Sequence, residues 1–331
     1  DQIEGTTHPS QTEKIYGHSH SQKEFINAYC SKRLHHGWLI SGPAGIGKAT
    51  LTWKFVKLLL SMDEKHLISC NFDDNSFDIN RVSLDRNHAL EKRIAAGSEP
   101  RILVLRRIFD PKAKNLKKFI TVDQVRQLNS FFHLSCPYGK IRIVIIDCVE
   151  DLNANAANAI LKTLEEPPSN SFFFLISHNA NSISSTIRSR CRQLKLKSLN
   201  ISDFEKALGA LEINTENHDK QLLFTLSKGS VGAAIKLINM SGIARYKKII
   251  NILKELPKLN HQELSEFANQ FSGKTSSKDY TNFIWLFELV LNRIALFGVG
   301  LDQKHLSNIN FEYETFKKLS PNLECARIWA Y

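Results

Sequence analysis

Short apolar runs alternate with amphipathic segments along the N-terminal part of this 331-residue chain. The apolar runs predict strands at 37–41, 101–109, 141–146, 172–177 and 192–196. Apolar residues at helical spacing predict helices at 21–31, 48–60, 121–135 and 153–164. Because near-continuous apolar runs are typical of strands covered on both faces, the alternation predicts a parallel sheet with helices on its faces. The expected fold class up to residue 197 is therefore α/β.

Beyond residue 197 the pattern is helical throughout. Short helices are expected at 201–211, 219–227 and 231–240, and longer ones at 243–255, 262–271, 280–297 and 311–331. Proline and glycine residues separate these segments, as they do at helix ends. The chain is therefore expected to contain an α/β domain (1–197), a small helical lid (198–242) and a C-terminal all-helical domain (243–331).

Two segments of the first domain carry few structural signals. Residues 61–100 are polar and irregular and predict a surface excursion, and residues 110–118 predict a basic loop. Near the N-terminus, His8, His18 and His20 have no cysteine or acidic partners at metal-binding spacing, so surface positions are expected for them.

The sequence GPAGIGKAT, which begins at Gly42, lies between a predicted strand and a predicted helix. It is close to the phosphate-binding pattern G-x-x-x-x-G-K-[ST]. In that pattern glycines let backbone N–H groups surround the phosphates, the helix N-terminus attracts the anion, and the lysine reaches the outer phosphates. The candidate nucleotide-binding residues are Gly42, Gly45, Gly47, Lys48, Ala49 and Thr50.

The pattern departs from its consensus at Ala49, where a hydroxyl should bind Mg²⁺. Thr50 carries a hydroxyl, but one residue along a helix turns the side chain by about 100°, so this hydroxyl is expected to point elsewhere. The sequence therefore predicts a phosphate-binding loop that lacks a competent site for hydrolysis of Mg²⁺-ATP.

A second informative stretch runs from Ile141 to Cys191. A buried strand ends at Asp147, where open α/β sheets bind ligands. The following helix stops at Pro167, and the stretch closes on the tripeptide Ser-Arg-Cys that contains Arg190. An acid at a strand end predicts a metal–nucleotide site, and the arginine predicts a contact with phosphate.

Composition limits the possible settings. Hydrophobic residues make up 42% of the chain and charged residues 23%, which is ordinary for a globular protein. No apolar run approaches the roughly 20 residues that span a membrane, and the polar beginning lacks a signal-peptide layout. A cytoplasmic location without membrane contact is expected.

Six cysteines are scattered without a C-x-x-C pair, so neither a structural zinc site nor a disulfide framework is expected. The simplest expectation is six free thiols, most of them buried. The net charge of +11 and the pI of about 9.3 favour work near nucleic acid. Basic residues cluster within 101–118, and this segment faces either DNA or solvent.

Three motifs together resemble the clamp-loader subunits of bacterial DNA polymerase III, which are AAA+ proteins: GPAGIGKAT, NANAANAILKTLEEPP and SRC. The resemblance covers residues 8–240 and extends to the C-terminal helices only in general character. It implies a P-loop AAA+ parallel-sheet domain, a small helical lid and an all-helical C-terminal collar for oligomerisation. It also places Walker A on Gly42–Thr50 and Walker B on Ile143–Glu150, and it makes Arg190 an arginine finger for the γ-phosphate in a neighbouring subunit.

Several departures from the active members of that family concern catalysis. Cys148 replaces the glutamate that positions water, Ser177-His178 stand at the first sensor position, and Gly232 replaces the arginine of the lid motif. The zinc-binding knob is reduced to Cys70. The resemblance thus implies a subunit that binds ATP or ADP weakly, if at all, and does not hydrolyse it.

Two main hypotheses follow. In the first, the chain supplies Arg190 to a neighbouring ATPase within the DNA polymerase III holoenzyme; its partners are the ATPase and clamp-opening subunits, the sliding clamp and primed DNA. In the second, it is a self-sufficient, DNA-stimulated P-loop ATPase that uses Thr50 for Mg²⁺ and Glu150 or Glu165 as base. A nucleotide-sensing adaptor without DNA contact is a third hypothesis, and a structural salt bridge is the alternative role of Arg190.

Overall fold

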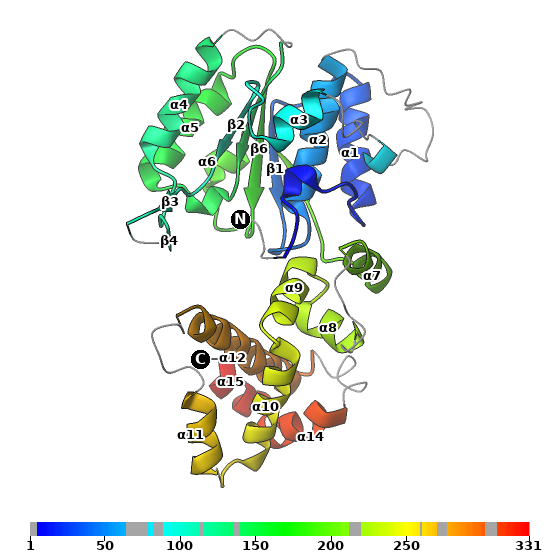
Figure 1. Cartoon of the computed structure of the whole chain (residues 1–331), viewed down its shortest axis with the longest axis vertical. Coiled ribbons are helices and arrows are strands. Elements are labelled where there is room, and N and C mark those ends of the chain that lie inside the picture. Colours follow the sequence, from blue (N-terminus) through cyan, green and yellow to red (C-terminus); the bar gives the residue numbers. More distant parts are fainter. Residues whose placement is uncertain are drawn as a thin grey trace. The chain divides into compact units, whose positions relative to one another are not determined.

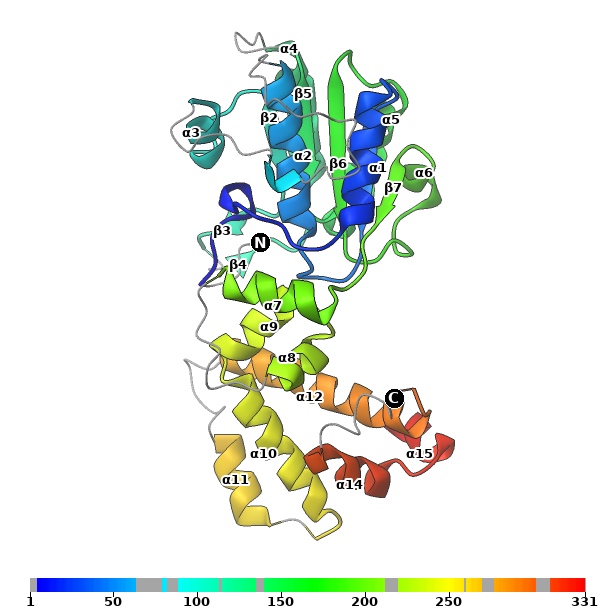
Figure 2. The same ribbon diagram turned by 90° about the vertical axis from the view of Figure 1, so that its right-hand side faces the viewer.

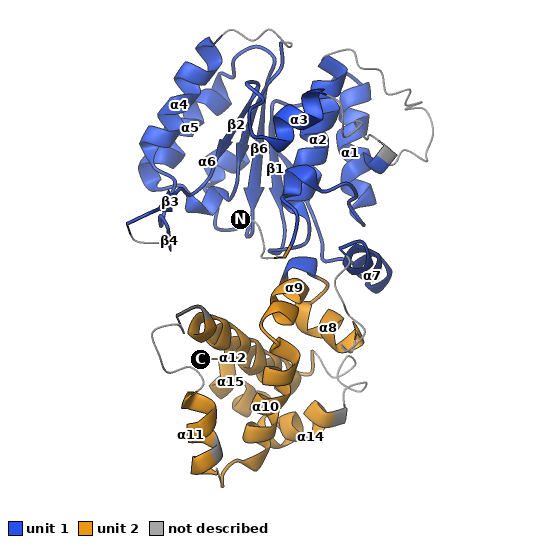
Figure 3. Ribbon diagram, in the orientation of Figure 1, with its two compact units in different colours: residues 1–2, 6–211, 230–232 blue, residues 3–5, 212–229, 233–331 orange. Residues whose placement is uncertain are grey.

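The computed structural model describes residues 5–63, 79–81, 89–112, 115–134, 140–211, 220–258, 260–269, 277–301 and 310–330. The chain divides into two compact units (Figure 3). Unit 1 comprises mainly Thr6–Leu211, with Ser230–Gly232 added from later in the chain. Unit 2 comprises mainly 212–229 and Ala233–Tyr331. The predicted boundaries at 197/198 and 242/243 stay predictions.

Unit 1 is built on a five-stranded parallel sheet in the order β2-β5-β6-β1-β7. The strands are β1 (Gly37–Ser41), β2 (Ile102–Leu105), β5 (Arg142–Ile146), β6 (Ser171–Ser177) and β7 (Arg192–Lys195). The register pairs Ser41 of β1 with Ser177 of β6, and Ile146 of β5 with Leu175 of β6. The carboxyl ends of β1, β6 and β5 therefore lie side by side along one edge of the sheet.

Helices cover both faces of this sheet (Figures 1 and 2). One face carries α1 (Ser19–Cys30), α2 (Lys48–Asp63) and α3 (Ala89–Ala95), and the other carries α4 (Val122–His133), α5 (Ala154–Glu165) and α6 (Ser185–Arg188). Side chains alternate between the faces, as the pleat of a strand requires: Trp38 and Ile40 join the first core, and Leu39 the second. The predicted α/β fold, a parallel sheet with helices on both faces, is confirmed.

Three sequence predictions in unit 1 were wrong in detail. The strand expected at 101–109 ends at Leu105, because the chain leaves the sheet where Arg106 becomes exposed. The expected basic loop contains a small hairpin of β3 (Phe109–Asp110) and β4 (Asn115–Leu116). The segment expected to be irregular contains a short 3-10 helix, η2 (Ile79–Arg81), and α3, which buries Leu90 and Ile94.

Several 3-10 and α-helical elements complete unit 1. They are η1 (Pro9–Gln11), η3 (Val149–Asp151) and α7 (Ile201–Gly209). A capping box begins α4, since the side chain of Gln124 accepts the N–H of Thr121 at 3.1 Å. The amide of Asn153 caps α5 by accepting the N–H of Ala156 at 2.8 Å.

Unit 2 consists of helices in its described part. They are α8 (Lys220–Ser227), α9 (Val231–Asn239), whose first two residues group with unit 1, α10 (Gly242–Glu255), α11 (His261–Asn269), α12 (Ser277–Gly298), α14 (Asn310–Leu319) and α15 (Leu323–Ala330). Residues 311–331 were predicted as one helix, but the segment breaks at Ser320–Pro321 because proline cannot continue a helix.

The helix α12 organises the core of unit 2, where it packs against α10, α14 and α15. Residues Asp279–Gly298 of this helix are long and apolar enough to cross a membrane, but the core helices of globular proteins have the same length and composition. Its charged residue Arg293 is buried, donates to Glu312 at 2.6 Å and to the hydroxyl of Tyr246 at 3.0 Å, and so ties three helices together. We interpret α12 as the core helix of this unit.

Candidate functional site

The phosphate-binding loop connects β1 to α2, as predicted. Its three glycines, Gly42, Gly45 and Gly47, all have positive φ angles. At Gly42 a Cβ atom would lie 2.4 Å from the carbonyl oxygen of Leu196, so any side chain there would collide with backbone. The loop therefore has the glycine-dependent shape that brings backbone N–H groups around an anion.

Lys48 is held by the loop that it follows. Its ammonium donates to the carbonyl oxygens of Gly42 at 2.7 Å and Pro43 at 2.5 Å, and the residue is only 3% exposed. Burial lowers the pKa of Lys48 to about 8, although the nearby acidic groups of Glu150 and Asp147 act in the opposite direction. A phosphate would have to replace these two carbonyls as the partner of Lys48.

Residues 230–232 lie directly on the phosphate-binding loop. The hydroxyl of Ser230 donates to the carbonyl of Ala44 at 2.8 Å, and the N–H of Gly232 donates to the carbonyl of Gly45 at 2.9 Å. A Cβ at Gly45 would come within 2.6 Å of the Ser230 hydroxyl and 2.9 Å of the Gly232 Cα. The position predicted for a sensor is thus a backbone contact, which we call the strap (residues 230–232).

The N-terminal segment also reaches this loop. His18 was expected at the surface, but it is half-buried and its Nε2 lies 2.8 Å from the carbonyl oxygen of Ile46. Burial lowers the pKa of His18, and the contact with Ile46 opposes that shift. Ile15 is buried close by. Two separate parts of the sequence, 15–18 and 230–232, therefore hold the loop in place.

Asp147 and Cys148 follow β5, at the edge where the loop lies. The N–H of Asp147 donates to the carbonyl of Leu105 at 2.9 Å, so the backbone of Asp147 extends the sheet. Cys148 has a φ of 78°, and its thiol donates to Glu150 at 3.3 Å. Burial, reinforced by the charges of Glu150 and Asp151, raises the pKa of this thiol to about 12. A neutral thiol therefore occupies the position at which the family resemblance implies a carboxylate base.

Glu150 has an anchoring role that the sequence analysis missed. One of its oxygens, Oε1, accepts the Ser177 hydroxyl at 2.7 Å and the backbone N–H groups of His178 at 2.8 Å and Asn179 at 2.7 Å. Although burial opposes it, these hydrogen bonds hold the pKa of Glu150 below its ordinary value. The carboxylate fastens η3 to the end of β6 and is a weak base. An acid three residues after Asp147 was the sequence signal for it.

The predicted sensor position therefore meets Glu150 through its backbone. The imidazole of His178 has a lowered pKa, because of burial and the charge of Lys48, while Glu150 and Asp147 oppose the shift. The structure thus brings together Lys48, Asp147, Cys148 and His178 as predicted, with Glu150 among them. Their assembly at one edge follows from the strand order, since β6 lies between β1 and β5.

Arg190 lies at the opposite edge of the sheet. It precedes β7, and a Cβ on Gly37, the first residue of β1, would lie 3.1 Å from the Arg190 carbonyl oxygen. The phosphate-binding loop begins at the other end of β1, which at about 3.3 Å per residue is roughly 16 Å away. Arg190 and Asp147 therefore do not share a site, in agreement with what the family resemblance implies.

Neighbouring residues of the same chain bind the guanidinium of Arg190. Nη1 donates to the Thr186 carbonyl at 2.8 Å and to the Ser189 hydroxyl at 3.3 Å, and Nη2 forms an ion pair with Glu165. The side chain remains 31% exposed. Glu165 terminates α5 at this same edge, which places it too far from Lys48 to act as a base on a nucleotide bound there.

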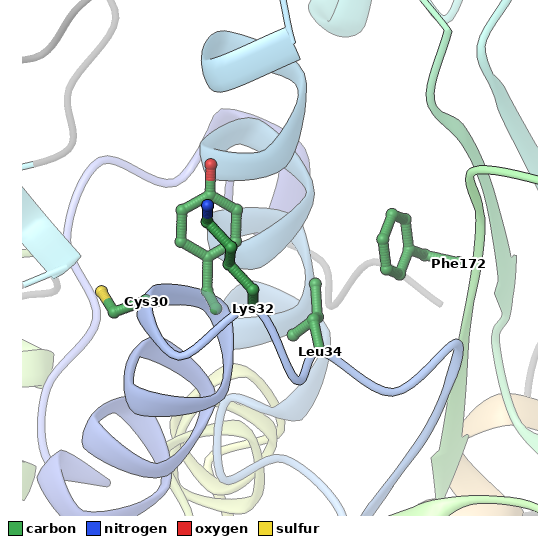
Figure 4. A pocket seen from close by; sticks show the side chains of 5 residues that line it. Cys30, Lys32, Leu34 and Phe172 are labelled. Atoms are coloured by element: carbon green, nitrogen blue, oxygen red, sulfur yellow. The ribbon is translucent and has the colours of Figure 1, made fainter.

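A shallow pocket lies elsewhere on unit 1 (Figure 4). Tyr29, Cys30, Lys32 and Leu34 line it from the end of α1 and the segment that follows, together with Phe172 near the beginning of β6. These residues share nothing with the phosphate-binding set. We therefore do not place the nucleotide there.

The cysteines differ from expectation in part. Of the four cysteines described, Cys191 is buried, Cys30 is exposed, and Cys148 and Cys325 are half-buried, so the prediction of mostly buried thiols was wrong for these. Cys70 and Cys136 lie outside the described residues. In the described ranges, no group of three or more His, Cys, Asp or Glu side chains is placed to hold a metal ion.

The basic segment 101–118 serves more than one purpose. Arg101 is fully buried and pairs with Glu99 at 2.7 Å, and Arg107 pairs with Asp151 at 3.0 Å, so these two stabilise the domain. The remaining described basic residues are exposed: Arg106, Lys112, Lys117 and Lys118. Whether they meet DNA or solvent stays a prediction.

Comparisons with known proteins give the family. A family model described as "DNA polymerase III, delta subunit" matches residues 17–200. DNA polymerase III subunit gamma of Buchnera aphidicola (subsp. Schizaphis graminum) is 28% identical over 70% of this chain and 58% of its own length. DNA polymerase III subunit delta' of Pseudomonas aeruginosa is 34% identical over 48% of this chain and 42% of its own length. The chain thus spans about half the length of these relatives.

Among solved structures, a DNA polymerase III gamma subunit-related protein from Thermotoga maritima is 19% identical, covers 95% of this chain and 98% of its own, and has a TM-score of 0.33.

Proposed function

The chain belongs to the DNA polymerase III delta subunit family of clamp-loader AAA+ proteins, and from this premise we propose that it is a delta'-like subunit that does not hydrolyse ATP itself. Its role is to supply Arg190 to the nucleotide of a neighbouring ATPase subunit. The complex then loads the sliding clamp on primed DNA during replication.

The observation that carries this proposal is the separation of Arg190 from the chain's own phosphate-binding loop. The guanidinium lies at the edge where the strands begin, and Lys48 lies at the edge where they end. An arginine that stabilises charge on a transferred phosphoryl group must contact it directly. Arg190 can therefore serve only a nucleotide held by another subunit.

The chain's own pocket supports the second half of the proposal. Ala49 has no hydroxyl for Mg²⁺, and the thiol of Cys148, with a pKa of about 12, cannot accept a proton from water at neutral pH. Gly232 provides a backbone contact in place of an arginine. Each of these groups contributes orders of magnitude to hydrolysis in an active site, so their joint loss favours a pocket without turnover.

Nucleotide binding itself is a separate question of affinity. A phosphate must displace the Gly42 and Pro43 carbonyls from Lys48, so we expect weak binding of ATP or ADP. Isothermal titration of the purified chain with ATP measures this directly. No heat at high protein concentration would show that the pocket is vestigial.

The proposed partners are the ATPase and clamp-opening subunits, the sliding clamp and, through the complex, primed DNA. The helices of unit 2 are proposed to form the collar that joins the subunits, and the cytoplasm is the proposed location. The exposed part of the basic segment is a candidate DNA contact within the complex.

The alternative, a self-sufficient DNA-stimulated ATPase, has two candidate bases, and the geometry disfavours both. Glu150 is fastened by three donors, and Glu165 lies at the wrong edge of the sheet. The test is phosphate release by the purified chain alone, with and without primed DNA, beside the reconstituted complex. We expect no release above background from the chain alone; DNA-stimulated turnover that is lost in Lys48→Ala would contradict the proposal.

A further inference from the structure

The ion pair between Arg190 and Glu165 joins two segments that the sequence keeps 25 residues apart. Glu165 is the last residue of α5, and Arg190 follows α6. Both side chains are accessible, with 31% of Arg190 and 49% of Glu165 exposed. The pair therefore lies where an incoming molecule can reach both partners.

The C-terminus of α5, where Glu165 lies, is an unusual place for a negatively charged side chain. A helix carries partial negative charge at its C-terminus, so a carboxylate there is unfavourable unless a cation neutralises it. His36 already lies 2.9 Å from the carbonyl oxygen of Leu164, one of the last carbonyls of α5. Arg190 forms an ion pair with the Glu165 carboxylate, so the two charges neutralise each other at this edge of the sheet.

The guanidinium is only partly satisfied by these contacts. Nη1 and Nη2 have acceptors, but Nε is buried and has no hydrogen-bond partner among the described residues. An arginine binds a phosphate most strongly through two parallel N–H groups. Because Nε is buried and Nη1 already donates to Thr186 and Ser189, a phosphate that binds through Nη2 must displace the oxygen of Glu165.

We propose that Glu165 is an exchange partner for Arg190: it holds the arginine when no phosphate is present and is displaced by the γ-phosphate of a neighbouring subunit's nucleotide. This inference rests on the proposed function of Arg190. A carboxylate next to a triphosphate repels it, so Glu165 weakens the engagement of Arg190 and makes it depend on the full charge of ATP. Glu165 acts through Arg190 and is a positioning residue.

The adjacent residue supplies a matched control. Glu166 is exposed, immediately follows α5 and carries the same charge at the same helix end, but the ion pair is made by Glu165. Glu165→Gln and Glu166→Gln therefore remove the same charge within one residue of each other. Only the first is expected to change the behaviour of Arg190.

The experiment measures ATPase activity of the reconstituted complex as a function of ATP concentration. Glu165→Gln is expected to lower the ATP concentration for half-maximal activity by roughly 1.5- to 5-fold, the range typical of an exposed ion pair. The shift should shrink in high salt, which screens the charges, and should disappear in the double variant Glu165→Gln/Arg190→Ala. Thermal unfolding of each variant checks that the subunit folds.

The outcomes separate this inference from the function on which it rests. If Arg190→Ala leaves the ATPase unchanged, the proposed function fails. If Arg190→Ala lowers the ATPase but Glu165→Gln matches Glu166→Gln, the exchange is wrong and the function stands. A decrease of activity in Glu165→Gln would mean that Glu165 holds Arg190 in its working position, which also overturns the exchange.

Discussion

At the scale of single residues, the behaviour of the pocket depends on what replaces the missing base. Cys148 stands at the position of that base, and Glu150 lies two residues further on. The carboxylate of Glu150 binds the end of β6, where its Oε1 accepts three hydrogen bonds from residues 177–179. An acid near a phosphate-binding loop is therefore insufficient reason to infer hydrolysis, because its hydrogen bonds decide whether it can act as a base.

The anchoring role of Glu150 predicts a pH-dependent loss of stability. Its folded-state pKa is lowered, so its contribution is present above the ordinary value of 4.5 and is lost as the pH falls through the folded-state pKa. Glu150→Gln removes the charge and should destabilise the protein by about 1 kcal/mol at pH 7. Thermal unfolding from pH 7 to pH 3 should show this difference shrinking below pH 4.5; a difference that stays constant would exclude the charge as its source.

The raised pKa of Cys148 predicts low reactivity. A thiol with a pKa of about 12, compared with an ordinary value of 9.0, has about a thousandfold less thiolate at pH 8, and thiolate is the reactive form. Iodoacetamide labelling followed by mass spectrometry should modify the exposed Cys30 long before Cys148. Comparable labelling rates for the two in the folded protein would show that the Cys148 thiol is neither buried nor held by Glu150.

At the scale of elements, the strap (residues 230–232) is the contact that fixes the phosphate-binding loop from a distant part of the chain. The family resemblance implies a lid arginine at position 232, whereas here Ser230 and Gly232 donate hydrogen bonds to the carbonyls of Ala44 and Gly45. The absence of a side chain at Gly45 permits this close approach, since a Cβ there would lie 2.9 Å from the Gly232 Cα. The strap therefore depends on the glycine at position 45.

The strap predicts that Gly45 cannot carry a side chain. Gly45→Ala would place a Cβ 2.6 Å from the Ser230 hydroxyl at a φ of 75°, so we expect a loss of about 1–3 kcal/mol in the free energy of unfolding. Gly209→Ala in α7 is the control, because its Cβ meets nothing within 4 Å. It should leave stability unchanged or raise it by up to about 1 kcal/mol. Equal denaturant midpoints for the two variants would show that the strap does not form.

Sequence patterns predicted the elements well where one local signal dominates. The apolar run at 37–41 is β1, and Asn153 and Pro167 bracket α5 as expected. The hairpin β3–β4 and the short α3 were missed, because two-residue strands and a single pair of buried apolar residues leave no clear periodicity. The break between α14 and α15 was also missed, although Pro321 gave a signal for it.

The site was predictable in its membership but incompletely in its contacts. Glycine spacing identified the loop, and the strand-end position of Asp147 placed it at the same edge. The contact between Ser230 and Ala44 joins residues 186 positions apart, so no local pattern contains it. The same holds for the pair of Arg190 and Glu165, which depends on both α5 and β7 reaching one edge of the sheet.

At the scale of the whole molecule, unit 1 has two chemically different edges. The carboxyl edge of its sheet holds the phosphate-binding loop, Cys148 and the carboxylate of Glu150, which is anchored by three hydrogen bonds. The opposite edge holds an accessible arginine on a compact support. This arrangement is suited to a subunit that acts on its neighbour's nucleotide.

The most direct test of that claim is the ATPase rate of the reconstituted complex with Arg190→Ala. The control is Arg192→Ala, which removes another arginine from the same edge, one paired with Glu24 at 3.0 Å. An arginine finger contributes roughly 10³–10⁵-fold at the site that it serves, so Arg190→Ala should remove that site's share of the activity while assembly stays intact. Arg192→Ala should retain it. An unchanged rate in Arg190→Ala, in a complex that assembles normally, would contradict the proposed role of this subunit.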